Sequence, residues 1–337
     1  MGFKRLDAED FVVSADAVQG VAWSTGAPTL SQFFTSSVQY AGSSGNYYLS
    51  VYQTGSALSN AAVQFDIAYA DILGSGSALF NSGITGKSPS ATVYGQYRSL
   101  VLEDETAGFI FGSGTNTLSV NNFWAISIER ARYKEKLFPG TFNLHLSGSN
   151  GIIKLTDNSK DTNIQTFLGS NRVLQVISGS NGTSGTLANG GSVADSGSYG
   201  LFLPDIGTVL LNPYAISQSI HVDALRNNDN DDTNPRTLYD SISLGANFQL
   251  NSEETITSDY VFVRSRNSEF NYSTNPSYIS GSTGEIIFDQ FINNPQTYIT
   301  TVGMYNDANE LVAVAKLSRP LLKDFTKESL IRVKLDF

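Results

Sequence analysis

Apolar and polar residues alternate with a period of two along much of the chain, and this pattern constrains the fold more than any other sequence feature. Val, Phe, Ile and Tyr occupy alternate positions from 63 to 69, and similar alternation recurs at 124–128, 142–146 and 331–337. Successive side chains of a β-strand point to opposite faces, so such segments place one face on a core and leave the other to solvent. We therefore predict a mainly β fold of antiparallel, β-sandwich-like domains with a few short helices.

Three segments are candidates for those helices. Residues 90–102 carry tyrosines and valine near helical spacing. Residues 213–225 follow Asn212, a residue type that caps helix N-termini, and begin with a proline, which is favoured at the first helical position. Residues 235–244 are the third candidate. On the sequence alone, all three segments stay open between helix and irregular backbone.

A stretch rich in glycine and serine interrupts the chain near its middle. Residues 178–200 contain seven glycines and six serines, a composition typical of an exposed loop or an interdomain linker. We therefore predict an N-terminal β-rich domain over 1–177 and a C-terminal β-rich assembly domain over 201–337, although the two could share one core. No internal repeat of about 20–50 residues is apparent, which argues against a propeller or a solenoid.

The C-terminal third has the clearest pattern of strands. Residues 297–305 and 311–317 are predicted strands joined by an Asn- and Asp-rich turn, because these side chains bond their own backbone. Pro320 is expected to interrupt the second strand, and residues 330–337 form a last strand. A strand that runs to a chain end is often an edge strand, and unpaired edges attract partners.

Composition excludes several classes of function. The chain has no cysteine and two histidines, which excludes thiolate catalysis, zinc fingers, iron–sulfur ligation and histidine-rich metal centres. The 31 acidic residues outnumber 21 lysines and arginines, and the net charge of −10 opposes binding to nucleic acid. No apolar run approaches the ~18 residues that span a bilayer, and no signal peptide is visible. We expect a soluble intracellular product with no nucleic-acid partner and no membrane insertion.

Two short motifs suggest ligands, but both match poorly. Residues 86–88, Gly-Lys-Ser, match the last three residues of the phosphate-binding loop motif. Asn81, however, occupies the position of the motif's first glycine. Residues 227–240 offer many oxygen ligands and place Asp240 at the twelfth position of a calcium loop, but Asn234 replaces the glycine of the sharp turn. A solvated surface loop explains 227–240 equally, and calcium binding there stays open.

Arrangements for hydrolysis are weak as well. The chain has no G-x-S-x-G elbow for a nucleophilic serine. His145 lies within a predicted strand, and His221 lies near Asp223. Carboxylates cluster at 103–105 and 253–254, between strands, where charged residues belong in any case. We predict no catalytic, cofactor-binding or metal-binding residues, and therefore no enzyme and no cofactor.

Four C-terminal segments carry a resemblance to a known class of protein. They are residues 261–278, 295–306, 310–318 and 330–337, together about 80 residues of chain, and 130–142 is a less specific match. This block resembles virion structural proteins of contractile-tailed bacteriophages, of the baseplate-wedge or tail-assembly type. The resemblance implies a non-enzymatic structural component of the tail, located in the virion and assembled in the host cytoplasm. The implied partners are other tail and baseplate proteins, together with further copies of the chain.

The expected contact residues lie in a loop and in the last strand. Asparagines interleave with aromatic residues from 267 to 276, so this region is either a rigid loop serving its own chain or a subunit contact. The last strand could pair within its own sheet or with a partner strand. The candidate interface residues are Arg264, Asn267, Phe270, Asn271, Tyr272, Asn275, Arg332, Lys334 and Phe337.

Charge is distributed unevenly along the chain. Six lysines and arginines oppose three acids in 316–337, whereas five aspartates oppose two arginines in 223–240. This asymmetry would allow complementary contacts between copies.

Two other functions remain open. The alternative is a receptor- or glycan-binding tail fibre or adhesin, because Ser, Thr, Asn and Gly make up 126 of the 337 residues and tyrosine is abundant. A glycan depolymerase is a third hypothesis.

Overall fold

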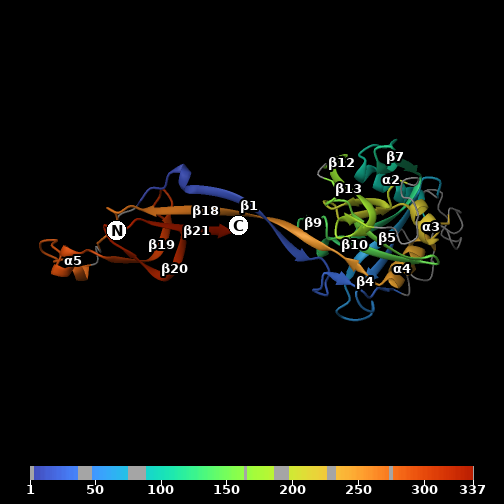
Figure 1. Ribbon diagram of the computed structural model, residues 1–337. Helices are drawn as coiled ribbons and strands as arrows, with labels where there is room; N and C mark the ends of the chain where they lie inside the picture. The colour runs from blue at the N-terminus through green and yellow to red at the C-terminus, as the bar shows by residue number, and fades with distance from the viewer. Residues whose placement is uncertain are drawn as a thin grey trace. The chain divides into compact units, whose positions relative to one another are not determined.

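The computed structural model describes residues 4–36, 48–74, 89–162, 165–185, 197–225, 233–272 and 276–336. The chain is mainly β, as the sequence predicted, with 46% of residues in strands and 17% in helices (Figure 1). It divides into two compact units. The larger unit is Val18–Glu254, and the smaller unit combines Met1–Ala17 with Thr255–Phe337.

The chain therefore divides elsewhere than at 178–200, where the sequence suggested a linker. Residues 178–180 belong to β13 (Asn171–Ser180), and β13 pairs with β15 (Gly200–Leu203) inside the larger unit. At least two glycines of this stretch serve close backbone approach. A Cβ at Gly179 would lie 2.1 Å from the carbonyl oxygen of Thr183, and one at Gly200 would lie 2.2 Å from that of Leu210. Residues 186–196 lie outside the described part of the chain.

This close packing gives a testable prediction at Gly200. Gly200→Ala is expected to lower the free energy of unfolding by about 2 kcal/mol, because the strand must shift to admit the methyl group. Gly95→Ala is the matched control, since it lies in helix α2 (Ser90–Val101) with nothing within 4 Å of the added carbon. It should raise stability by about 0.5–1 kcal/mol. Both tryptophans lie in the larger unit, so urea titration followed by their fluorescence measures the two changes.

The larger unit is built on one thirteen-stranded antiparallel sheet. Along its main path the strand order is β2-β17-β10-β11-β13-β15-β16-β8-β5-β4-β3, with β12 and β14 paired to β13. The remaining strands are β2 (Thr29–Leu30), β3 (Phe34–Thr35), β4 (Leu49–Tyr52), β5 (Val63–Asp71), β8 (Asn122–Ile128), β10 (Asn143–Gly148), β11 (Gly151–Asp157), β12 (Thr166–Leu168), β14 (Thr183–Ser184), β16 (Thr208–Leu211) and β17 (Phe248–Gln249).

The sheet curls so that strands near its two ends face each other. Phe65 of β5 packs against Phe248 of β17 with ring centroids 5.2 Å apart, although many strands separate them in the sheet. Trp23 and Phe33 pack on the same ring, with centroids 6.2 Å from it. The inner face of the sheet therefore encloses the main hydrophobic core.

The outer face of the central strands is also buried, which corrects the expectation of a wet face. Ala68, Phe123 and Ala125 point away from the main core, yet they form a second apolar cluster. Helix α2 and the hairpin of β6 (Phe109–Ser113) and β7 (Asn116–Val120) contribute to this cluster. The side chains of these strands still alternate between the two faces of the sheet, but helix α2 and the β6–β7 hairpin cover the outer face in place of solvent.

All three candidate helices are confirmed. Besides α2, they are α3 (Pro213–Ile220) and α4 (Asn234–Gly245). The side chain of Asn212 accepts hydrogen bonds from the backbone N–H groups of Tyr214 and Ala215, as expected of an N-cap. Helix α3 ends earlier than predicted, because His221 adopts a left-handed conformation with φ +54°.

The smaller unit contains two small sheets. Strands β1 (Phe11–Val21), β18 (Asn251–Ser265) and β21 (Ser329–Asp336) form one, in the order β1-β18-β21, and β1 and β18 both continue into the larger unit (Figure 1). β9 (Lys136–Leu137), a strand of the larger unit, also pairs with β18. Strands β19 (Thr297–Tyr305) and β20 (Leu311–Lys323) form the other sheet. Single-turn helices are η1 (Ala8–Asp10), η5 (Pro276–Tyr278) and α5 (Asp289–Asn293), with η2 (Arg130–Arg132) in the larger unit.

Strand β20 corrects one prediction about Pro320. The strand continues through this proline to Lys323 instead of ending before it. The pairing with β19 is nevertheless broken there, because Ile299 pairs with Leu321 while Thr301 pairs with Lys316. Pro320 lies in this irregular segment, where its missing N–H removes no regular ladder bond.

Candidate functional site

The smaller unit exposes many more large apolar side chains than it buries. Among its described residues, Val261 and Val333 are the buried apolar side chains. We call the exposed set the apolar surface. It comprises Phe11, Val12, Val13, Phe270, Tyr272, Ile287, Phe288, Ile292, Tyr298, Tyr305, Leu311, Val312, Val314, Phe325 and Leu330. A unit that exposes so many large apolar side chains and buries so few is a candidate for a protein–protein interaction site.

Two parts of the apolar surface have a clear origin in the sequence. Phe11, Val12 and Val13 begin β1, a strand in which no residue is buried. Tyr305 and Leu311 pair across the β19–β20 hairpin, and Val312 and Val314 follow on β20 with 69% and 58% of their surface exposed. A two-stranded hairpin of this kind is marginally stable alone, so contact with a partner would stabilise it.

A buried lysine joins the loop after β18 to the end of β20. Lys323 has no exposed surface, and its ammonium donates to Asn271 Oδ1 at 2.7 Å and to the carbonyl oxygens of Asp324 and Asn267 at 2.9 and 3.2 Å. Burial lowers the pKa of Lys323, while Asp324, Glu269 and Glu328 act in the opposite direction. Three oxygen acceptors therefore bind the charged Lys323 ammonium inside the smaller unit, at a buried position that apolar side chains usually occupy.

The loop residues predicted as contacts divide into internal and exposed ones. Asn271 is 1% exposed, and its amide also donates to the Asn267 carbonyl, so its side chain serves the chain's own loop. Phe270 and Tyr272 are 40% and 59% exposed and belong to the apolar surface. Asn275 lies outside the described residues.

The structure brings the predicted basic residues to one face of the β18–β21 pair. Phe262 pairs with Arg332, Tyr260 with Lys334 and Arg264 with Leu330. The guanidinium of Arg332 lies 5.2 Å from the centre of the Tyr260 ring. Lys334 forms an ion pair with Asp336 at 2.9 Å, and Arg264 forms one with Glu328 at 2.7 Å. Phe337 lies outside the described residues.

Sequence reasoning missed Lys323 and β1. Lys323 follows Leu321 and Leu322 and precedes Asp324, a pattern that reads as the solvated end of a strand. The run Phe11-Val12-Val13 lacks alternation, so it gave no period-two signal. Its three consecutive apolar residues, next to acidic ones, were the only available indication of an exposed strand.

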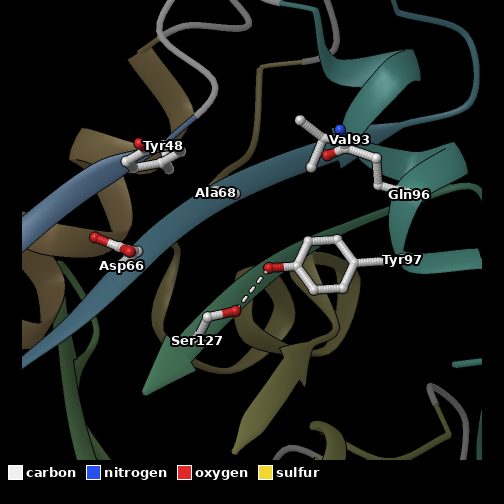
Figure 2. Close-up of a pocket in the computed structure, with 7 residues that line it drawn as sticks. All are labelled: Tyr48, Asp66, Ala68, Val93, Gln96, Tyr97 and Ser127. Carbon is white, nitrogen blue, oxygen red and sulfur yellow. Dashed lines mark hydrogen bonds between the residues drawn. The ribbon is translucent and has the colours of Figure 1, made fainter. Parts of the chain in front are cut away.

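The larger unit has a small polar pocket on the outer face of its sheet, of about 120 Å³ (Figure 2). Asp66 of β5 lies across from Ser50 of β4 on one side and Ser127 of β8 on the other. The hydroxyls of Ser127 and Tyr97 are hydrogen-bonded at 2.8 Å. Tyr48, Ala68, Val93 and Gln96 complete the lining. The pocket is smaller than the roughly 300–1,000 Å³ of a typical small-molecule site.

The Asp66 carboxyl has an unusual environment in this pocket. Burial raises its pKa, a hydrogen bond with Ser50 lowers it, and the negative charge of Glu129 raises it further. Among the described residues, Asp66 Oδ1 is buried without a hydrogen-bond partner. The pocket therefore presents an acceptor beside two hydroxyls, an arrangement that can bind a hydroxyl or amine group.

Asp66 gives a second prediction, on pH dependence. A carboxyl whose folded pKa is raised opposes folding once it ionises, so stability falls as pH rises from the unfolded pKa of 3.8. Asp66→Asn should exceed the wild type in stability at about pH 7 and match it at about pH 3. Asp104→Asn should be less stable than the wild type at about pH 7 and closer to it at about pH 3, because hydrogen bonds from Thr106 lower the pKa of Asp104. Urea titrations at both pH values test the two signs.

The other acidic candidates have structural partners. Glu103 accepts hydrogen bonds from the N–H and hydroxyl of Ser170. Glu253 and Glu254 lie 3.8 and 3.7 Å from Lys136 and Lys134, respectively, so the second carboxylate cluster is ion-paired. The two clusters therefore contain no free pair of facing carboxylates within the described chain.

Within the described residues, the candidate calcium ligands Asp240 and Asn234 have structural partners of their own. Asp240 lies on α4 at 3.7 Å from Arg236, and the buried Asn234 bonds the backbone of Leu225. Residues 226–232 and the motif at 86–88 lie outside the described residues. Burial lowers the pKa of His145, and Lys154 adds to this effect. No group of three or more metal-ligating side chains occurs in the described ranges.

Comparisons with protein families, curated proteins and solved structures find no match for this chain. No helix in the described part of the chain has the length and apolar character needed to cross a membrane.

Proposed function

We propose that the chain is a non-enzymatic structural component of a contractile bacteriophage tail, a baseplate wedge subunit that holds neighbouring tail proteins together. The observation that carries this proposal is the apolar surface of the smaller unit. A unit with so few buried apolar side chains gains little hydrophobic stabilisation alone, at about 25 cal/mol per Å² buried. Neighbouring proteins that cover its surface would supply the missing stabilisation.

The sequence resemblance supports the same conclusion. Its main segments, 261–278, 295–306, 310–318 and 330–337, all fall in the smaller unit. Under this proposal the protein resides in the virion and assembles in the host cytoplasm. The smaller unit provides the contacts, and the larger unit has its own core.

Incorporation into tail particles tests the proposal. Tails purified from a phage that encodes this chain should contain it, and deletion of its gene should stop tail assembly. Val312→Asp should reduce incorporation strongly, because it places a charge in the apolar surface. Leu58→Asp is the matched control, since Leu58 is 56% exposed in the larger unit. Complete tails assembled without the protein would refute the proposal.

The pocket favours a second candidate, a receptor- or glycan-binding tail protein. Tyr48 is 53% exposed and shares the pocket with the amide of Gln96 and the carboxyl of Asp66. An aromatic ring beside polar groups is an arrangement that can recognise sugars. Binding on a glycan array that Tyr48→Ala and Gln96→Ala both abolish would support this candidate, and an array without hits would remove it.

A further inference from the structure

We propose that the three-stranded sheet of the smaller unit continues from one copy of the chain to the next, with β21 of one copy pairing with β1 of a second. The inference rests on the proposed structural function and identifies one partner as a second copy of this chain. It follows from the two edges of the sheet, from their charges and from the exposure of β1.

Both outer strands have an unpaired edge. Among the described residues, β18 is the sheet neighbour of β1 and also the neighbour of β21. The outer backbone N–H and C=O groups of both strands are therefore available to a further strand. Long, exposed, apolar edge strands are normally protected by charge, proline or a covering element. The first residues of β1, Phe11, Val12 and Val13, are 49%, 48% and 68% exposed and lack that protection.

The charges of the two edges are opposite. Strand β1 carries one acid, Asp16, and no base, whereas β21 carries two bases, Arg332 and Lys334, against one acid, Asp336. Pairing β21 with its own copy around Val333 would place Arg332 opposite Lys334. Pairing β1 with its own copy around Asp16 would place two carboxylates together. Like charges directly opposite are destabilising, so these two self-pairings are disfavoured, whereas β21 and β1 can place Arg332 opposite Asp16.

An antiparallel register with Asp16 opposite Arg332 satisfies both charge and hydrophobicity. It places Val13 opposite Leu335 and Ala15 opposite Val333, so apolar residues pair on the other face. The contact uses two different surfaces and is therefore heterologous, which produces a closed ring or an open filament. A ring would suit a repeated component of a tail.

Charge reversal at the two edges tests the pairing by sedimentation velocity of the purified full chain. Wild-type protein should form oligomers that dissociate on dilution. Asp16→Arg and Arg332→Asp should each weaken association about tenfold, because an attractive pair becomes repulsive. Asp307→Arg is the control for net charge, since Asp307 lies in the β19–β20 turn. It should leave association unchanged.

Mixing the two single variants gives the decisive result. Each variant then offers the edge that complements the other, so the mixture should recover wild-type association, and the double variant Asp16→Arg/Arg332→Asp should recover it as well. A wild type that remains monomeric at every concentration, or a mixture without recovery, would overturn the inference. Absence of the protein from phage tails would instead refute the proposed function, and would leave the self-association result standing.

Discussion

Replacing Phe65 with alanine is expected to lower the free energy of unfolding of the larger unit by about 4 kcal/mol. The Phe65 ring is fully buried where the two ends of the curled sheet meet, and it contacts Trp23, Phe33 and Phe248. Its removal leaves a cavity that the surrounding rings cannot fill without displacing strands of the sheet. Urea titration followed by tryptophan fluorescence measures the change, because Trp23 and Trp124 both belong to this unit.

Phe167 provides the matched control for Phe65. It lies on β12 with 56% of its surface exposed. Phe167→Ala should change the free energy of unfolding by less than about 0.5 kcal/mol. Equal effects of the two substitutions would contradict the closure of the sheet around Phe65.

The second large effect is expected at Lys323. Lys323→Met should destabilise the smaller unit by about 3 kcal/mol, because it leaves two buried acceptors, Asn271 Oδ1 and the Asp324 carbonyl oxygen, without their charged donor. The unit has little apolar burial to offset this loss. Hydrogen–deuterium exchange of β21 and of the β18 residues after 254 should therefore accelerate. The tryptophan fluorescence transition of the larger unit should stay unchanged, since both apolar core clusters belong to that unit.

Lys316→Met is the control for Lys323→Met, since Lys316 is exposed on the same strand. It should leave hydrogen–deuterium exchange in the smaller unit unchanged. If Lys323→Met shows the same wild-type exchange, the account of the buried lysine is wrong.

The sequence predicted the strands and helices well because their signals are local. Period-two alternation identified β5, β8 and β21, and the cap at Asn212 identified the start of α3. The same alternation could not show that α2 and the β6–β7 hairpin cover the outer face. That covering depends on contacts between segments far apart in the chain.

Long-range contacts also explain what the sequence could not predict about domains and site residues. A glycine-rich stretch such as 178–200 can be a linker or tightly packed backbone, and the contacts of Gly179 and Gly200 show that its described ends are tightly packed. Asn271 was predicted as a contact from its amide, but burial beside Lys323 gives it an internal role. The exposed partners in that loop, Phe270 and Tyr272, stay predictions.

Under the proposed function, partner proteins cover the apolar surface of the smaller unit in the assembled tail. Hydrogen–deuterium exchange of β1, β19 and β20, compared between isolated protein and purified tails, tests it most directly. We expect strong slowing of exchange in these strands in the tail, with little change in the core strands of the larger unit. Unchanged exchange in β1, β19 and β20 within tails would contradict it.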